Sequence, residues 1–349
     1  MTSTRGNKTG GQVPLVAVIM PAYNSEDSIV RAIESVRRQT MTDWTLTIVD
    51  DGSTDSTTET VARYVAQHSA TNIHLETLAN NVGVAEARNV GIAKSESTWI
   101  AFFDADDEME PNHLATVFKH ASRESDIDMV LCGRTVVLAN GTESLQHSSA
   151  LGTFDGTAAA RLTLSDLLTP FPWDRLIRRT LFDGSGFPKG AVRCEDSMTN
   201  VVLCSRARKV TSIPDPGIRY YVSGGSITWG RVYSLDDTRI AWDYMYTNIP
   251  AALKKGKFAH ALNNARASMA LTIAQTAMLR DGADVPRERR ELVSTVVTEC
   301  RAHIRLRDIV GGLIVNPKTG TAAALMKFVP SVYEWLYRRY VRATYAVGS

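Results

Sequence analysis

Short apolar runs alternate with helical patterns along residues 15–132 of the chain. The runs are bounded by turn residues, and this pattern predicts buried strands. They occupy residues 15–20, 44–49, 73–75, 98–103 and 129–132. Between them, apolar residues recur at helical spacing, as at Ile29, Ile33 and Val36. Strands that alternate with helices predict an α/β layer structure with mainly parallel strands.

The rest of the chain follows two other patterns. Residues 133–232 are less regular, with a Gly/Pro-rich loop at residues 183–190 and a predicted helix from Glu195. From Leu235 onward the pattern is almost entirely helical. Breaks are predicted near Gly256, Gly282, Gly311 and Pro317.

The predicted domain organisation follows these changes of pattern. Residues 1–13 form a flexible tail, residues 14–232 an α/β region and residues 233–349 a helical region. The α/β region divides further into a regular half at residues 14–132 and a less regular half at residues 133–232.

Polar residues follow three of the predicted strands at the point where each strand ends. The clusters are Pro21-Ala22-Tyr23-Asn24, Asp50-Asp51 and Asp104-Ala105-Asp106-Asp107. Open α/β sheets bind ligands beyond the carboxyl ends of their strands, so the three clusters together indicate one cleft. An Asp carboxylate can accept the N3–H of a uracil ring and a Tyr face can stack on it, which predicts a nucleoside pocket. Taken singly, the first two clusters are also typical of turns and helix caps.

The acidic cluster carries the strongest chemical signal. Carboxylates at Asp104, Asp106, Asp107 and Glu108 repel one another unless a cation lies among them. Hard oxygen ligands suit Mg²⁺ or Mn²⁺, and Mg²⁺ is usually held by one or two carboxylates plus substrate phosphates. The cluster therefore predicts a metal ion that binds a phosphorylated donor.

Two further segments are candidates for chemistry. Arg88 lies in the predicted helix that begins at Gly83, where a helix N-terminus favours an anion and the guanidinium can add a fork for a diphosphate. The alternative is that Arg88 is an exposed helix residue. Glu195 and Asp196 begin another helix, where acids are favoured by the helix dipole alone. The functional alternative is a general base that takes the proton from an attacking hydroxyl.

Composition narrows the function classes. The formal net charge of +2 gives no overall electrostatic case for nucleic acid binding. The four cysteines form no CxxC pair, so neither a disulfide framework nor a zinc site is predicted. The first 13 residues lack an apolar core, so they do not read as a signal peptide. We expect a cytoplasmic protein, either free or peripheral at the inner face of the cell membrane.

The charge is uneven, because residues 305–349 carry seven Lys/Arg against two acids. The same segment contains six aromatic residues: Phe328, Tyr333, Trp335, Tyr337, Tyr340 and Tyr345. A basic, aromatic helix can lie on an anionic membrane surface. The alternative is that its apolar side packs on the α/β region or forms a homo-oligomer interface. We favour this alternative, because the Ala-rich residues 258–279 also need a partner surface.

Taken in order, the motifs resemble those of the family 2 glycosyltransferases of GT-A fold. They are Val18-Ile19-Met20-Pro21-Ala22-Tyr23-Asn24, Gln39-Thr40, Asp50-Asp51-Gly52-Ser53-Thr54-Asp55, Asn81-Val82-Gly83 with Ala87-Arg88-Asn89, Asp104-Ala105-Asp106-Asp107 and Glu195-Asp196. The resemblance covers about residues 14–232, and the ordered set is far more specific than any one motif. It implies a Rossmann-like mixed sheet flanked by helices, a nucleotide-sugar half at residues 14–132 and an acceptor half at residues 133–232. It also implies inverting transfer of a sugar from a nucleotide-diphosphate donor, with a UDP-sugar expected.

The resemblance implies roles for individual residues. Those expected to contact the nucleotide sugar are Pro21, Ala22, Tyr23, Asn24, Asp51, Arg88, Asp104, Ala105, Asp106 and Arg231. Asp106 matches the metal-binding member of the DxD motif and would hold Mn²⁺ or Mg²⁺. Asp196 matches the catalytic base. Trp173 and Glu195 are expected on the acceptor side, although Trp173 fits simple core packing equally well.

The chain departs from the family pattern at one place. Ser226-Ile227-Thr228 resembles the loop that closes on the donor, and a basic residue often precedes it. Here Val222 and Ser223 stand at that place, so Arg231 is the candidate substitute for the diphosphate clamp.

The expected activity is metal-dependent hexosyl-type transfer to a hydroxyl group. The acceptor would be a cell-envelope polysaccharide, a teichoic-type polymer or a glycolipid, as the resemblance implies. Two other classes stay open: a non-catalytic nucleotide-sugar-binding or scaffold protein, and a nucleotidyltransferase. The last also uses paired carboxylates and metals but would release pyrophosphate.

Overall fold

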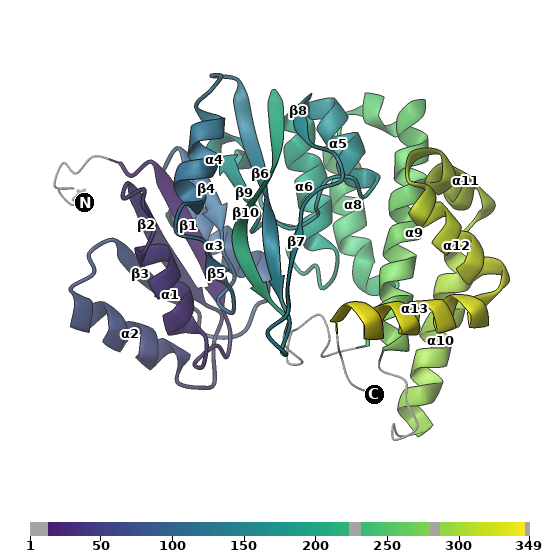
Figure 1. Ribbon diagram of the computed structural model, residues 1–349, viewed down its shortest axis with the longest axis horizontal. Coiled ribbons are helices and arrows are strands. Elements are labelled where there is room, and N and C mark those ends of the chain that lie inside the picture. Colours follow the sequence, from purple (N-terminus) through teal and green to yellow (C-terminus); the bar gives the residue numbers. More distant parts are fainter. Residues whose placement is uncertain (1–12, 223–231, 280–286, 346–349) are drawn as a thin grey trace, which may run out of the picture.

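A mixed sheet runs through the part of the chain that the computed structural model describes, residues 13–222, 232–279 and 287–345 (Figure 1). The strand order is β3-β2-β1-β4-β9-β6-β10-β5, with β7 paired to β6 and β8 to β10. The strands are β1 Val16–Ala22, β2 Trp44–Asp50, β3 Ile73–Thr77, β4 Trp99–Phe102, β5 Glu108–Met109, β6 Ile127–Val137, β7 Glu143–Gln146, β8 Gly152–Asp155, β9 Arg175–Arg178 and β10 Lys209–Tyr221. The α/β class is therefore confirmed.

Strand direction differs between the two halves of the sheet. β1 is parallel to β2 and β4, and β2 is parallel to β3, as the alternating pattern predicts. β9 is inserted between β4 and β6 and is antiparallel to both. The expectation of mainly parallel strands thus describes the first half, and the whole sheet is mixed.

Helices cover both faces of the sheet. Those of the α/β region are α1 Ile29–Arg37, α2 Thr57–His68, α3 Val84–Lys94, α4 His113–Ala121, α5 Gly156–Leu164 and α6 Glu195–Arg206. Buried residues of α1, α2 and α4 share one hydrophobic cluster with the sheet, and buried residues of α3, α5 and α6 share another. The sheet is therefore the middle of three layers.

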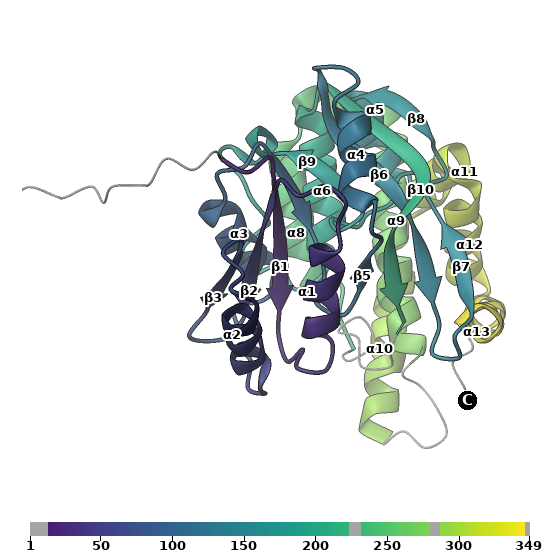
Figure 2. The same ribbon diagram turned by 60° about the vertical axis from the view of Figure 1, so that its left-hand side comes forward.

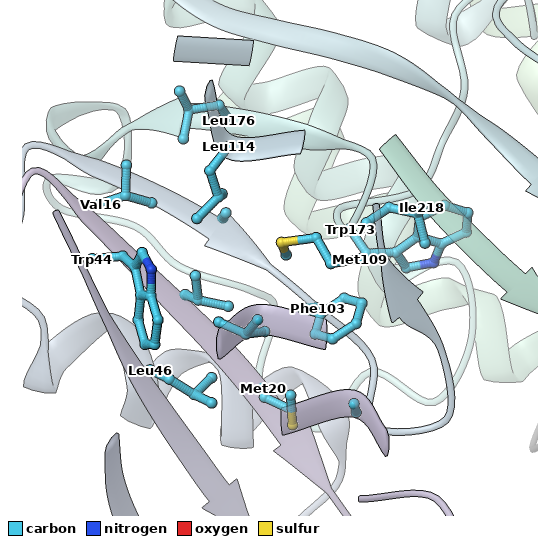
Figure 3. Packing of buried hydrophobic residues seen from close by; sticks show 14 of the residues in the cluster. Val16, Met20, Trp44, Leu46, Phe103, Met109, Leu114, Trp173, Leu176 and Ile218 are labelled. Carbon is cyan, nitrogen blue, oxygen red and sulfur yellow. The ribbon is translucent and has the colours of Figure 1, made fainter. Parts of the chain in front are cut away.

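The pleat of β1 explains how one strand supports both layers. Val16, Val18 and Met20 belong to the first cluster, whereas Ile19 belongs to the second. Figure 3 shows the first cluster from close by, with Met20 near Leu46 and with Trp173 beside Ile218 at its far end. Because both faces are buried, the strand reads as a continuous apolar run.

The helical region follows the sheet and lies on the side away from β3 (Figure 1). It contains α8 Arg239–Asn248, α9 Lys257–Met278, α10 Arg287–His303, α11 Leu306–Val315, α12 Pro317–Phe328 and α13 Pro330–Tyr345. Ala261 and Ala265 of α9 pack in the second sheet cluster, whereas Ala270 and Ala274 pack in a third cluster with α10 to α13. The Ala-rich segment therefore packs on the α/β region with one end and supports the later helices with the other.

One predicted break is wrong. Gly311 lies inside α11, where a Cβ atom would come 2.7 Å from the Asn263 Cβ and 2.8 Å from the His260 carbonyl oxygen. The glycine thus allows α11 to approach α9 closely instead of ending a helix. Pro317 does mark a boundary, since it begins α12. Gly282 lies outside the described residues.

Candidate active site

The three polar clusters meet at one edge of the sheet. Ala22, at the end of β1, lies opposite Asp50, at the end of β2, and the Asp51 amide donates to the Ala22 carbonyl oxygen at 2.8 Å. On the other side of β1, the Phe103 amide donates to the Ile19 carbonyl oxygen at 2.9 Å. Residues 21–24, 50–51 and 104–107 therefore follow adjacent strand ends, as the sequence predicts.

Asp51 is buried and joins two loops of this edge. Its two carboxylate oxygens accept hydrogen bonds from the backbone amides of Val82 at 2.8 Å and Gly83 at 2.9 Å. Burial is the main cause that raises the pKa of the Asp51 carboxyl, and these two amides oppose it. Gly83 has a φ of 92° and precedes α3, so Asp51 fixes the start of that helix. Each oxygen keeps a lone pair for a nucleobase, which stays a prediction.

Tyr23 and Asn24 differ in their surroundings. The Tyr23 side chain is 40% exposed, which leaves its ring accessible for stacking. Asn24 adopts a φ of 49°, and its Oδ1 accepts a hydrogen bond from the Thr54 amide at 2.8 Å. Asn24 therefore links the turn after β1 to the turn after β2. Pro21 and Ala22 are the buried end of β1 itself.

Arg88 joins residues that lie far apart in the sequence. Its guanidinium donates to the Asp196 carboxylate, lies 3.4 Å from Asp104 Oδ1 and lies 3.9 Å from Glu195 Oε1. The side chain is only 3% exposed, so the alternative of an exposed helix residue is wrong. The Arg88 guanidinium, which was expected to bind a diphosphate, therefore pairs here with these three carboxylates.

Phe187, in the loop before α6, packs against the Arg88 side chain. The Arg88 guanidinium carbon lies 5.2 Å from the ring centroid of Phe187. Asn89, the next residue of α3, accepts from the Phe187 amide at 2.7 Å and donates to the Phe187 carbonyl oxygen at 3.0 Å. The sequence marked Asn89 only as part of a motif and gave no signal for Phe187.

Two carboxyl groups next to Arg88 have raised pKa values. Burial raises the pKa of Asp104 to about 6, against the attraction of Arg88. Burial and then the charge of Asp196 raise the pKa of Glu195 to about 7, again against Arg88. The cluster therefore holds carboxyl groups that exchange protons near neutral pH, and such groups are typical of functional sites.

The four acids at residues 104–108 do not point to one centre. Asp107 is fully buried and its Oδ1 accepts from the Tyr221 amide at 2.9 Å, whereas its Oδ2 has no hydrogen-bond partner among the described residues. Burial raises the pKa of this carboxyl well above its usual value. Glu108 pairs with Arg31 at 3.3 Å. Asp107 and Glu108 are therefore engaged with other parts of the protein, and the prediction that Asp106 holds a cation stays a prediction.

Asp106 and Asp104 are the acids of this turn that stay at the surface. Asp106 is exposed, and the Asp104 side chain keeps 28% of its accessible surface. Within residues 13–222, 232–279 and 287–345, no group of three or more His, Cys, Asp or Glu side chains forms a metal cage. One or two carboxylates with hard oxygen atoms still suit Mg²⁺ or Mn²⁺, because substrate phosphates supply the other ligands.

Arg31 is a residue that the sequence reasoning missed. Its guanidinium donates to the Asp106 carbonyl oxygen and lies 4.3 Å from the ring centroid of Tyr221. Together with the Asp107–Tyr221 hydrogen bond, this contact fastens the acidic turn to the end of β10. Nothing in the sequence pattern of α1 marks Arg31, because it lies among ordinary polar positions of an amphipathic helix.

Trp173 is buried in an aromatic stack. It is 4% exposed and lies between Phe171, at a centroid distance of 4.8 Å, and Tyr220, at 5.6 Å. The Arg134 guanidinium carbon lies 5.8 Å from the Trp173 ring centroid. The core-packing alternative describes these surroundings, and contact with an acceptor stays a prediction. Arg231 and residues 226–228 lie outside the described residues.

None of the described helices combines the length and the apolar character that a bilayer crossing requires. The four cysteines are free thiols, and Cys132, Cys204 and Cys300 are buried.

Comparison with known proteins assigns the α/β region. Residues 17–186 match the sequence profile of the family described as Glycosyl transferase family 2. The putative glycosyltransferase EpsH of Bacillus subtilis is 27% identical over 223 residues, which cover 62% of this chain and 63% of EpsH. The glycosyltransferase GlyG of Streptococcus pneumoniae is 26% identical over 223 residues, which cover 61% of this chain and 72% of GlyG. The match thus spans less than two thirds of EpsH.

Solved structures agree on the fold. S. aureus TarS in complex with UDP-GlcNAc has a TM-score of 0.64 at 19% sequence identity, over 95% of this chain and 91% of that chain. This likeness shows the fold, a GT-A mixed sheet flanked by helices and followed by a helical region. Residues 17–186 therefore match Glycosyl transferase family 2, and the fold of the described chain agrees with that match.

Proposed function

We propose that this protein is an inverting, metal-dependent glycosyltransferase that moves a sugar from a UDP-sugar to a hydroxyl group of a cell-envelope glycan or glycolipid. The observation that carries the proposal is the position of Arg88 between Asp104 and Asp196. Asp104 belongs to the edge where the nucleotide would bind, and Asp196 is the candidate base. The nucleotide-binding residues and the base must lie close together, so that the attacking hydroxyl group can reach the bound donor sugar.

The donor would lie along the carboxyl ends of β1, β2 and β4. Tyr23 offers an exposed ring for the base, and Asp51 offers carboxylate oxygens that are already fixed by two amides. Support for a uridine nucleotide comes from two similar proteins. TarS is known in complex with UDP-GlcNAc. The UDP-Glc:alpha-D-GlcNAc-diphosphoundecaprenol beta-1,3-glucosyltransferase WfgD of Escherichia coli is 33% identical over 154 residues, which cover 44% of this chain and 55% of WfgD.

The residues present fit a divalent metal ion. Asp106 is exposed and Asp104 partly exposed, which matches a site of one or two carboxylates completed by a diphosphate. A mannosyltransferase of Pyrobaculum calidifontis, solved with GDP-Man and Mn²⁺, has a TM-score of 0.55 at 18% identity, over 91% of this chain. Mn²⁺ or Mg²⁺ on Asp106 would supply positive charge for the leaving diphosphate.

The proton transfer would be carried out by the chain's own residues. Asp196 accepts the proton of the attacking hydroxyl group. Arg88 orients the Asp196 carboxylate, because its buried guanidinium is itself held by Phe187 and Asp104. Attack from the face opposite the diphosphate needs one base and gives one inversion at the anomeric carbon.

The acceptor class rests on similar proteins. WfgD is named for a lipid-diphosphate acceptor. The putative teichuronic acid biosynthesis glycosyltransferase TuaG of Bacillus subtilis is 38% identical over 101 residues, which cover 29% of this chain and 39% of TuaG. We propose a polysaccharide, teichoic-type polymer or glycolipid of the cell envelope, modified on the cytoplasmic side, where free thiols such as those of the four cysteines persist.

A panel of nucleotide sugars tests the proposal. The purified chain is incubated with each donor, Mn²⁺ and a mixture of glycan acceptors, and the released phosphate compound is identified. Release of UDP with a glycosidic product of inverted anomeric configuration supports the proposal. A parallel incubation with a nucleoside triphosphate and a sugar 1-phosphate tests the alternative, and pyrophosphate release there would identify a nucleotidyltransferase. Donor binding without any release would identify a non-catalytic binding protein.

A further inference from the structure

Helix α13 presents an apolar stripe that the rest of the described chain leaves uncovered. Tyr333 and Val341, on its inner side, are about 5% exposed, and Tyr333 packs in the third hydrophobic cluster, that of the helical region. The outer side of α13, together with the last residue of α12 and the residue between the two helices, carries Phe328, Val329, Val332, Trp335, Leu336 and Tyr340. Their exposed fractions run from 42% for Leu336 to 61% for Phe328. The spacing of residues 332, 335, 336 and 340 places them on one face of the helix. We call these six residues the α13 stripe.

The described residues therefore leave this side of α13 exposed, away from the α/β region, and the expected homo-oligomer interface stays a prediction. An exposed stripe of this composition is unusual for a surface that meets only water. It contains Phe, Trp and Tyr, the residues that settle at the boundary between lipid headgroups and acyl chains.

Basic residues lie beside the α13 stripe. The Arg339 guanidinium carbon lies 5.7 Å from the ring centroid of Trp335, at the edge of the stripe. Arg301 also lies near the stripe, because its Nε donates to the carbonyl oxygen of Lys327, the residue before Phe328, at 2.9 Å. Glu334, the acid of the described α13 segment Pro330–Tyr345, pairs with Arg338 at 2.8 Å.

We propose that the α13 stripe docks on the surface of an anionic lipid bilayer, with its apolar side chains among the headgroups and its arginines on lipid phosphates. An apolar helix face flanked by Lys and Arg matches such a surface in both polarity and charge. A second copy of this chain matches it less well. A two-fold interface would bring the stripe and its bases against the same stripe and bases of the partner, so like charges would meet.

The position of α13 is compatible with catalysis at the membrane. In Figure 2, α13 lies toward the same end of the molecule as the carboxyl ends of β1 and β10, where the candidate active site lies. Docking through α13 would therefore turn the end of the sheet that carries the candidate active site toward the membrane. The docking itself does not depend on the proposed sugar transfer.

Vesicle co-sedimentation of the full chain tests the proposal. Vesicles of phosphatidylcholine alone are compared with vesicles that contain about 30% phosphatidylglycerol, at low and at high salt. We expect binding to the anionic vesicles that salt weakens. Leu336→Glu should lower the partition coefficient by about tenfold or more, since it places a charge among the apolar contacts. Leu151→Glu is the matched control, because Leu151 is 43% exposed, lies before β8 and should leave binding unchanged.

A second variant keeps the test valid if a charged residue disturbs folding. Trp335→Phe preserves the apolar face and should still bind, but it should lose the quenching of tryptophan fluorescence by brominated lipids. Equal, negligible binding of wild-type protein to both vesicle types would overturn the proposal. So would anionic binding that Leu336→Glu leaves intact. The proposal would also fail if the protein did not bind vesicles but had the mass of a dimer in solution, and Leu336→Glu reduced that mass to a monomer's. That result would assign the stripe to a dimer interface.

Discussion

Glu195→Gln should remove a pH dependence of stability that the candidate site imposes on the fold. The Glu195 side chain is 14% exposed, and its pKa rises from 4.5 to about 7, chiefly through burial. Because the folded-state pKa lies above the unfolded one, the folded state binds more protons between these two values. Stability therefore falls as the pH rises through this window, and the loss is complete above about pH 7. A pKa difference of this size corresponds to about 3 kcal/mol.

Urea unfolding at two pH values measures this effect. We expect the free energy of unfolding of wild-type protein to decrease from pH 4.5 to pH 8 by about 3 kcal/mol more than that of Glu195→Gln. Comparing the change with pH cancels any constant cost of burying the Gln amide. Glu288→Gln is the control, because Glu288 is exposed on α10. If wild-type protein and Glu195→Gln showed the same change with pH, Glu195 would not be a buried carboxyl with a raised pKa, and the described cluster would be wrong.

Four further substitutions test the site and the helical region. Asp196→Asn should reduce turnover by about 10²–10⁴-fold while donor binding persists, because it removes the base alone; unreduced product formation would exclude Asp196 from that role. Asp106→Asn should weaken the Mn²⁺-dependent binding of the donor, measured by calorimetry. An unchanged affinity would show that Asp106 does not hold the metal. Arg88→Lys should cost about 2 kcal/mol in urea unfolding, because a lysine cannot bridge the carboxylates of the cluster as a buried fork does; equal stability would contradict the bridging role. Gly311→Ala should lower the free energy of unfolding by about 1–3 kcal/mol through the clash between α11 and α9, whereas Val310→Ala, exposed on the same helix, should change it by under about 0.5 kcal/mol.

Apart from β3, the strands that the sequence predicts in residues 15–132 are buried on both faces. β1 reads as a continuous apolar run because the helices of both layers cover it, and β2 is marked by Trp44, Leu46, Ile48 and Val49. β9, with the sequence Arg-Leu-Ile-Arg, shows no such run, yet it is a central strand. Arg175, its first residue, is fully buried and pairs with Asp174 at 3.0 Å. A strand whose buried positions include a paired charge gives no hydrophobic signal, so it emerges only from the tertiary structure.

The candidate site was predictable in its composition but not in its contacts. The order of the motifs indicated that residues 104 and 196 act together. It did not indicate that Arg88 joins them, because the buried residues of α3 are Ala85, Ala87, Arg88 and Gly91, which form no hydrophobic stripe in the sequence. Likewise, no sequence rule distinguishes Asp106, which is exposed, from its neighbour Asp107, which is buried and bonded to Tyr221. The pairing with β10 that decides this comes from a residue 114 positions away.

The place of β10 in the sheet sets a lower limit on the length of a self-folding fragment. The family profile ends at Gly186, but β10, Lys209–Tyr221, pairs with one side of β6 and also with β5 and β8. A truncated chain that stops at residue 186 would leave that side of β6 as an open edge, which invites aggregation. It would also lack α6, so Arg88 would keep Asp104 as its partner but lose Glu195 and Asp196. Truncation for expression should therefore retain the chain through Tyr221 at least.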